Sequence, residues 1–406
     1  IIPDSRDTGD DTANRLLPRL KAYLVQRGAH LSVIAGFPWF LDWGRDSLIV
    51  TRGMIAAGLR EEAASVLKQF GGLEAEGTLP NMISGQDAGN RDTSDAPLWF
   101  FTACADMTGN GRRESFLNEA CRGRTIRDIL VSIGHWYVRG TANGIKMDHA
   151  SGLIFSPAHF TWMDTDHPAG TPRQGYCVEI QALWYAALQL LSSLDPDQRQ
   201  KWQDLARTVQ DSIRRLFPLP AGYLSDCLHA ETGQPAAQSE PDDALRPNQL
   251  LALTLGAVDD PGLARSTVDS CRTLLVPGAI RSLADQPVAR PLPVFHNGAL
   301  LNDPRRPYQG RYRGDEDTCR KPAYHNGTAW TWLFPVFCEA WAMVYGPPAR
   351  ATARAWLTSS LELMESGCLG HLPEILDGDY PHASRGCDAQ AWGLSEWLRV
   401  WRYLQD

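Results

Sequence analysis

Apolar residues recur at intervals of three and four along most of the chain, between stretches that are polar or rich in Gly and Pro. The stretch 175–192, GYCVEIQALWYAALQLLS, shows this most clearly, with Leu183, Trp184, Leu188 and Leu191 at roughly helical spacing. Pro196 begins another such stretch, as is normal for a first helical turn. The periodicity predicts helices over residues 13–27, 45–58, 60–71, 94–108, 115–139, 175–192, 196–216, 245–256, 262–275, 327–345, 349–365 and 388–403.

Strand patterns are few and short, at 144–148, 152–155 and 223–226, and we expect them to be hairpins on loops. Two all-α architectures accommodate about twelve helices: a helical-hairpin solenoid, or a barrel of six outer and six inner helices. A solenoid requires self-similarity with a period of roughly 30–45 residues, which the sequence lacks. The unequal loops at 73–93, 141–174 and 277–326 favour an all-α (α/α)6 barrel with long loops and a few short hairpins. Long structured loops are usually functional.

Composition and charge exclude several classes of protein. The 406 residues include 39 basic and 47 acidic side chains, a net charge of −8, which argues against nucleic-acid binding. No run of about 18 apolar residues predicts a membrane span, and the N-terminus lacks a signal-peptide pattern. The nine cysteines show no C-x-x-C spacing, so we expect thiols in a reducing, cytoplasmic environment. The length suggests two or three domains, but one barrel can use all of residues 1–406.

Tryptophan is unusually frequent, with 14 Trp against 12 Phe and 11 Tyr. Its flat apolar face and single N–H donor suit the faces of sugar rings as well as protein cores. Trp330 and Trp332, at the start of a predicted helix, fit either use.

The segment 36–46, GFPWFLDWGRD, has two interpretations. In one it is a turn, and Asp46 caps the following helix. In the other it is a sugar subsite. Asp42, Arg45 and Asp46 would then bind hydroxyl groups, and Trp39 or Trp43 would stack on a pyranose ring.

Two further loop carboxyls are candidates for acid–base chemistry. Asp164, in HFTWMDTD at 159–166, follows Trp162 and an apolar Met, which would raise its pKa as a general acid requires. We interpret Asp166 as a solvated loop residue, although the sequence does not settle its role against that of Asp164. Glu374 lies among apolar residues in HLPEILDGD, where a solvated turn is the plain alternative.

No pattern for a cofactor or a metal is present. H-E-x-x-H, the phosphate-binding G-x-x-x-x-G-K-[ST], G-x-G-x-x-G and the G-x-S-x-G elbow are all missing from the sequence. Asp95, directly before the run APLWFF, fits an N-cap as well as a site residue. What remains is carboxylates and aromatic residues on loops, the equipment for cleaving a glycosidic bond.

Five segments in a fixed order carry a resemblance to a known family. They are GFPWFLDWGRD, HFTWMDTD, GYCVEIQALWYAAL, YHNGTAWTWL and HLPEILDGDYPHASRGCDAQAWGLSEW. Together they resemble the glucosidase domain of glycogen debranching enzymes, the amylo-α-1,6-glucosidase family, over roughly residues 30–403. The resemblance implies an (α/α)6 barrel that hydrolyses the single α-1,6-linked glucose at a trimmed branch point of glycogen limit dextrin, with inversion.

The resemblance also implies roles for particular residues. Asp164 matches the family's general acid and Glu374 its general base. An inverting hydrolase holds two such carboxyls roughly 6.5–9.5 Å apart, with room for water. The residues expected to bind the substrate are Trp39, Asp42, Trp43, Arg45, Asp46, Asp95, Trp162, Glu179, His325 and Trp330.

The chain also departs from the family. Thr331 stands where the family more often has Pro, and Tyr176 where it has a basic residue. Neither an N-terminal β-rich domain nor a transferase is visible. We therefore expect residues 1–406 to be one barrel domain, either the C-terminal catalytic part of a longer protein or a minimal variant. The expected partner is a branched α-glucan, with no nucleic acid and no membrane. The alternatives are another exo-acting α-glucosidase or trehalase-like hydrolase, a non-catalytic glycan-binding module, and an isoprenoid-cyclising barrel.

Overall fold

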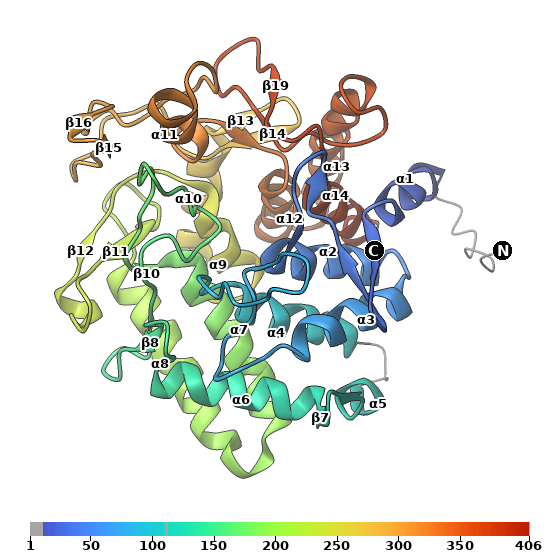
Figure 1. Cartoon of the computed structure of the whole chain (residues 1–406). Helices are drawn as coiled ribbons and strands as arrows, with labels where there is room; N and C mark the ends of the chain where they lie inside the picture. Colours follow the sequence, from blue (N-terminus) through green and yellow to red (C-terminus); the bar gives the residue numbers. More distant parts are fainter. Residues whose placement is uncertain (1–10, 110–112, 406) are drawn as a thin grey trace.

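The computed structural model describes residues 11–109 and 113–405, and six helical hairpins follow one another around a ring in it (Figure 1). The outer helices are α1 (Asp11–Lys21), α3 (Arg60–Gly71), α6 (Ile126–Arg139), α8 (Arg199–Leu216), α10 (Pro261–Arg272) and α13 (Arg350–Thr358). The inner helices are α2 (Gly44–Ala56), α4 (Ala96–Met107), α7 (Val178–Leu194), α9 (Leu250–Thr254), α12 (Leu333–Tyr345) and α14 (Ala391–Tyr403). Each inner helix packs on the next, and α14 packs on α2 to close the ring, so the fold is an (α/α)6 barrel.

The two rings differ in their hydrophobic patterns. On outer helix α8 the buried residues form one stripe, with Trp202, Ala206, Val209 and Ile213 three or four positions apart. Inner helix α7 is instead buried on nearly all sides, because it packs on its neighbours in the ring as well as on α8. The sequence pattern therefore predicts the helices, and the extent of burial separates inner from outer.

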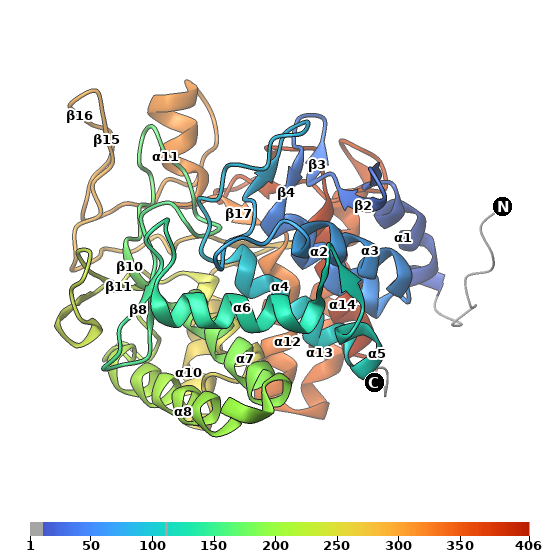
Figure 2. The same ribbon diagram turned by 60° about the horizontal axis from the view of Figure 1, so that its bottom comes forward.

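The connections at the two ends of the barrel differ in length. From inner to outer helices the chain passes through 57–59, 195–198, 255–260 and 346–349, and a longer run at 108–125 holds α5 (Arg113–Leu117). From outer to inner helices it passes through 22–43, 72–95, 140–177, 217–249, 273–332 and 359–390, the last but one holding α11 (Lys321–Tyr324). These longer loops precede the N-termini of the inner helices and therefore gather at one end, at the top in Figure 2.

Short antiparallel strands lie in the connections, most of them at this end of the barrel. The largest sheet has the order β13 (Leu275–Val276), β14 (Ala279–Arg281), β17 (Ala329–Trp330), β18 (Ile375–Leu376), β19 (Ser384–Arg385). A second has the order β10 (Gly175–Cys177), β11 (Cys227–His229), β12 (Glu240–Pro241). The remaining pairs are β1 (Leu24–Arg27) with β2 (His30–Val33), β3 (Gly36–Phe37) with β20 (Ala389–Gln390), β4 (Asp42–Trp43) with β5 (Met82–Ile83), β6 (Ala120–Cys121) with β7 (Arg124–Thr125), β8 (Lys146–Met147) with β9 (Ile154–Phe155), and β15 (Phe295–His296) with β16 (Ala299–Leu300).

Several predicted boundaries are wrong for local reasons. The helix predicted over 13–27 ends at Lys21, and residues 24–33 form the β1–β2 hairpin, whose turn holds Gly28 at positive φ. The helix predicted over 115–139 is interrupted by the β6–β7 hairpin, whose turn holds Gly123 at positive φ. The helix predicted from 327 begins at Leu333, after β17. The strand predicted at 223–226 lies instead at β11.

The structure also bears on the predictions about membrane spans and cysteines. No helix in the described part of the chain is long and apolar enough to cross a membrane. None of the nine cysteines, all of which lie in the described ranges, forms a disulfide, and seven are buried.

Candidate active site

A cavity of about 100 Å³ lies at the loop-rich end of the barrel, over the N-termini of inner helices α2 and α14. Four separate segments of the chain contribute its walls: residues 40–46, 162–164, 324–330 and 374–392. The lining residues are Phe40, Trp43, Arg45, Asp46, Trp162, Asp164, Tyr324, His325, Trp330, Glu374, Gln390 and Trp392. The fold thus brings together residues more than 300 positions apart, three of them carboxylic acids.

Arg45 organises one side of this cavity. Its side chain is buried, and Nε donates to Asp95 Oδ2 at 2.5 Å while Nη1 donates to Asp164 Oδ2 at 3.2 Å. Asp95 is fully buried behind it, whereas the Asp164 side chain remains 30% exposed. Burial raises the pKa of Asp164, and the Arg45 charge partly offsets that rise. Asp164 is therefore held in position by Arg45 and is still accessible from the cavity.

Glu374 on the other side is held by donors on both oxygens. Tyr324 donates its hydroxyl proton to Oε1, and the backbone N–H of Cys387 donates to Oε2 at 2.8 Å. Gln390 Nε2 lies 3.5 Å from Oε1. Burial nevertheless raises the pKa of Glu374 to about 7, because these hydrogen bonds do not fully replace the lost hydration. The position is thus poised to bind or release a proton near neutral pH.

Gly386 is what allows the backbone to approach this carboxylate. It adopts a φ of +67°, and a Cβ at this position would lie 2.2 Å from Glu374 Oε2. A side chain here would therefore both strain the backbone and displace the carboxyl group.

Asp46 is the third carboxylic acid in the cavity, and the alternative interpretation of it as a helix cap does not hold. The N-cap position of α2 is Trp43, which makes no side-chain cap bond, and Asp46 lies in the first turn, where an acid is favourable for the helix dipole. Its side chain is buried, and this burial raises its pKa to about 7, with Asp164 and Glu374 adding to the rise. The three carboxyls therefore share one electrostatic environment.

Aromatic rings form the rest of the cavity wall. The Trp162 ring contacts the rings of Trp330, Trp332 and Trp392 edge-on, with centroids 5.0, 5.2 and 6.5 Å away. His325 stacks on Trp330 at 5.2 Å, and burial lowers its pKa well below the usual range, so its ring is neutral. Such a cluster excludes water and strengthens the electrostatic interactions inside the cavity.

Several polar atoms in this wall have no hydrogen-bond partner among the described residues. They are Arg45 Nη2, His325 Nε2, Trp392 Nε1 and Gln390 Oε1. Because buried polar groups are nearly always paired, these atoms are the natural contacts for hydroxyl groups of a bound ligand. No group of three or more His, Cys, Asp or Glu within the described ranges could hold a metal ion.

Of the twelve residues predicted from the sequence, eight line the cavity and four do not. Asp42 is buried but pairs with Arg27, whose Nε and Nη2 lie 2.6 and 2.8 Å from its oxygens. Trp39 is 58% exposed. Asp95 stands at the N-cap position of α4 without a side-chain cap bond and contacts Arg45 instead.

Glu179 is the fourth residue outside the cavity. It is 1% exposed, and both its oxygens accept hydrogen bonds from Arg173, at 2.5 and 2.7 Å. Asp226 completes this buried cluster by accepting from Arg173 Nε at 2.7 Å. Asp166, by contrast, is 44% exposed beside two histidines, which agrees with the solvated residue expected.

Four residues that line the cavity were not predicted: Phe40, Tyr324, Gln390 and Trp392. All four lie inside the segments that carried the family resemblance, next to residues that were chosen. The segments GFPWF, YHNGTAW and DAQAW therefore pointed to this part of the chain, but the residue types of these four gave no reason to choose them.

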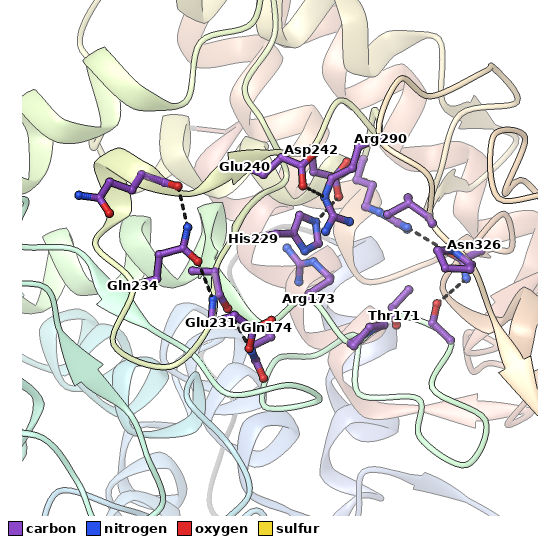
Figure 3. Close-up of a pocket in the computed structure, with 17 residues that line it drawn as sticks. Thr171, Arg173, Gln174, His229, Glu231, Gln234, Glu240, Asp242, Arg290 and Asn326 are labelled. Atoms are coloured by element: carbon purple, nitrogen blue, oxygen red, sulfur yellow. Dashed lines mark hydrogen bonds and ion pairs between the residues drawn. The ribbon is translucent and has the colours of Figure 1, made fainter.

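A second, larger cavity of about 480 Å³ is shown in Figure 3. Its walls come from residues 170–174, 229–246 and 290–293, together with Asn326. No aromatic residue other than His229 lines it, so its chemistry differs from that of the carboxylate cavity.

Comparison with known proteins then decides the family. The family model described as amylo-alpha-1,6-glucosidase matches residues 20–399. The chain belongs to the amylo-α-1,6-glucosidase family. It is also 23% identical over 426 aligned positions to the glycogen debranching enzyme of Saccharomyces cerevisiae, covering 81% of this chain and 26% of the yeast protein. The chain thus spans about a quarter of the length of that relative.

Several solved structures share the fold of this member of the amylo-α-1,6-glucosidase family. A structure titled wild-type glycosidase is 12% identical, with a TM-score of 0.64, and 100% of this chain and 99% of that chain are aligned. The GH63 mannosylglycerate hydrolase of Thermus thermophilus in complex with glucose is 16% identical, with a TM-score of 0.63, over 96% and 98% of the two chains. At such identities the likeness establishes the barrel, and the family membership makes the chain a glycoside hydrolase.

Proposed function

We propose that the protein is an exo-acting α-1,6-glucosidase that releases single glucosyl stubs from the branch points of glycogen limit dextrin, with inversion of configuration. The observation that carries the proposal is the small cavity in which Asp164 and Glu374 both lie, on different loops, in a member of this family. One carboxyl partly exposed and one deeply buried is a suitable arrangement for a general acid and a general base.

Asp164 is the proposed general acid. Burial raises its pKa, which keeps it protonated at higher pH than an exposed aspartate, and its partial exposure lets it reach the glycosidic oxygen. As the bond between C1 and the bridging oxygen breaks, Asp164 gives its proton to that oxygen. Arg45 then stabilises the carboxylate that forms, through the hydrogen bond it already makes.

Glu374 is the proposed general base. Its hydrogen bonds from Tyr324 and Cys387 favour the ionised form and fix the orientation of the carboxylate. A water molecule on the opposite face of the ring attacks C1, and Glu374 takes the proton it loses. The product is β-glucose from an α-linkage.

The size of the cavity supports exo action on one sugar unit. Pockets for drug-sized ligands measure roughly 300–1,000 Å³, and this cavity of about 100 Å³ is well below that range. Asp46, His325 and Trp392 supply polar atoms around it, and the Trp rings supply flat apolar surface for the CH groups of a pyranose.

The proposed site of action is the cytoplasm. The absence of disulfides among the nine cysteines supports a reducing compartment, and branched storage glucan is the proposed partner there.

A panel of substrates tests the linkage. The purified chain is incubated with limit dextrin bearing single α-1,6-glucosyl stubs, and with maltose, trehalose and mannosylglycerate, and the hydrolysis of each substrate is followed. We expect the highest kcat/KM on the limit dextrin, and Glu374→Gln serves as the inactive control. Preferential hydrolysis of maltose, trehalose or mannosylglycerate would overturn the proposed linkage specificity, and no hydrolysis of any substrate would leave the chain a glycan-binding module.

A further inference from the structure

The larger cavity opens at the same end of the barrel as the catalytic cavity and shares a wall with it. His325 lines the catalytic cavity and the next residue, Asn326, lines the larger one. Thr171, also in the larger cavity, has its Oγ1 3.4 Å from His325 Nδ1, and Asn326 Nδ2 donates to Gly170 O at 3.0 Å. The loop that carries Asp164 continues directly into this wall at Gly170 and Thr171.

The charges in the larger cavity are largely paired with one another. Arg290 Nε lies 3.1 Å from Glu240 Oε2, and His229 Nε2 lies 3.0 Å from Asp242 Oδ2. Arg173 points its guanidinium into the Glu179 and Asp226 carboxylates. Arg246 Nε lies 3.5 Å from Asp226 Oδ2. With a carboxylate beside each of its arginines, the cavity has little surplus charge to attract a phosphate or a metal ion. A neutral, hydrogen-bonding ligand is the better match.

The lining also includes four amide side chains, Gln174, Gln234, Gln238 and Asn326, together with apolar residues. Figure 3 shows Gln174 and Gln234 near Glu231 on one side of the cavity, and Gln238 and the apolar pair Leu292–Pro293 also line it. Amides both donate and accept hydrogen bonds, as hydroxyl groups do, and Leu292 and Pro293 offer contact to CH groups. Polyhydroxyl chains such as α-glucans present both kinds of group.

We propose that the larger cavity binds the glucan chain that carries the stub, while the stub itself enters the catalytic cavity. An α-1,6 linkage runs through an exocyclic carbon and so has an extra rotatable bond, which allows the chain and its branch to lie in adjacent cavities. With about 480 Å³, the larger cavity accommodates more than one glucosyl unit, unlike the catalytic one. This inference rests on the proposed α-1,6-glucosidase function.

Filling the larger cavity tests the inference. Leu292→Trp places a bulky ring on its apolar side, and Leu300→Trp, on the neighbouring β15–β16 hairpin and outside the cavity, is the matched control. Each variant is assayed on limit dextrin and on α-glucosyl fluoride, which occupies only the catalytic cavity. We expect Leu292→Trp to raise KM for limit dextrin at least tenfold with glucosyl fluoride hydrolysis within twofold of wild type, and Leu300→Trp to change neither.

A limit-dextrin KM unchanged in Leu292→Trp would overturn the inference, as would a parallel loss on both substrates in a folded variant. Should Leu292→Trp fail to fold, Gln238→Trp at the exposed rim takes its place. Maltotriose provides an independent readout, because it should compete with limit dextrin but not with glucosyl fluoride in the wild type.

The inference and the proposed function fail in different ways. A wild-type chain inactive on limit dextrin would refute the α-1,6-glucosidase proposal alone. Calorimetric binding of maltotriose, lost in Leu292→Trp and kept in Leu300→Trp, would then still support the glucan-binding cavity, and unchanged binding in both would overturn it.

Discussion

Two buried arginines lie at the loop-rich end of the barrel, each between two carboxylates, and they differ in what they leave unpaired. Arg173, with Glu179 and Asp226, forms a closed cluster in which every side chain is 3% exposed or less. Arg45, with Asp95 and Asp164, forms an open cluster: Asp164 is 30% exposed, and Arg45 Nη2 has no partner among the described residues. Both clusters carry strong charge-assisted hydrogen bonds.

This difference separates a buried ion cluster that can contact a ligand from one that only stabilises the fold. In the closed cluster the charged groups bond to one another and to Thr161 and Asn248, which holds the loops at residues 173 and 226 to helix α7. In the open cluster one oxygen and one nitrogen remain for a ligand. We therefore assign the open cluster to catalysis and the closed cluster to structure.

The largest expected effect comes from removing the acid or the base. Glu374→Gln and Asp164→Asn should each lower kcat on limit dextrin by roughly 10²–10⁴-fold, the usual contribution of acid–base catalysis. Asp164→Asn should retain activity on α-glucosyl fluoride, because fluoride leaves without protonation. Steady-state kinetics on both substrates provides the measurement.

Asp166→Asn is the matched control on the same loop, and we expect its kcat within twofold of wild type. A large loss in Asp166→Asn with none in Asp164→Asn would exchange the two assignments.

Opening the closed cluster should cost stability rather than activity. Glu179→Ala removes the carboxylate that accepts two hydrogen bonds from Arg173 and leaves a buried charge short of a partner. We expect the free energy of unfolding to fall by roughly 3–5 kcal/mol, measured by urea denaturation, with kcat per folded molecule unchanged. A loss of kcat at unchanged stability would instead make Glu179 a substrate residue, as the sequence suggested.

The positions of Glu179 and Asp42 outside the small cavity have a physical reason. Glu179 and Asp164 are both acids beside apolar residues, and the sequence does not reveal which arginine each will meet. The same holds for Asp42, because its partner Arg27 lies in a hairpin where the pattern predicted a helix. The barrel was predictable because helical periodicity is local. That Asp164 and Glu374 line one cavity was predictable because their segments resemble a family. The partners were not, since they come from loops far apart in the chain.

Ionised Glu374 should destabilise the fold above neutral pH. Burial raises its pKa to about 7 in the folded chain against 4.5 in the unfolded chain. A raised pKa gives stability that is present below about pH 4.5 and is lost as the pH rises through 7. Glu374→Gln should therefore be more stable than wild type at pH 8 by on the order of 3 kcal/mol.

The difference in stability should vanish at pH 4, and thermal unfolding at both pH values measures it. Equal stability of the two proteins at pH 8 would show that the hydrogen bonds to Glu374 already balance its burial.

A smaller effect is expected on the pH profile of activity. Because Glu374 must be ionised to act as a base, kcat/KM should fall as the pH decreases below about 7. Tyr324→Phe removes a donor that favours the ionised carboxylate, so this acidic limb should move to higher pH by about one unit. An unshifted limb with a uniformly lower kcat would mean that Tyr324 affects packing and not the ionisation of Glu374.

The central claim is that Asp164 and Glu374 act from opposite faces of one glucosyl ring, and the anomer of the first product tests it most directly. Limit dextrin with single α-1,6-glucosyl stubs is hydrolysed in the spectrometer, and the anomeric proton signals of free glucose are recorded before mutarotation mixes them. The proposed inverting mechanism predicts that β-glucose accumulates first. α-Glucose as the first product would contradict the account, because it requires a covalent intermediate on one of these two carboxylates.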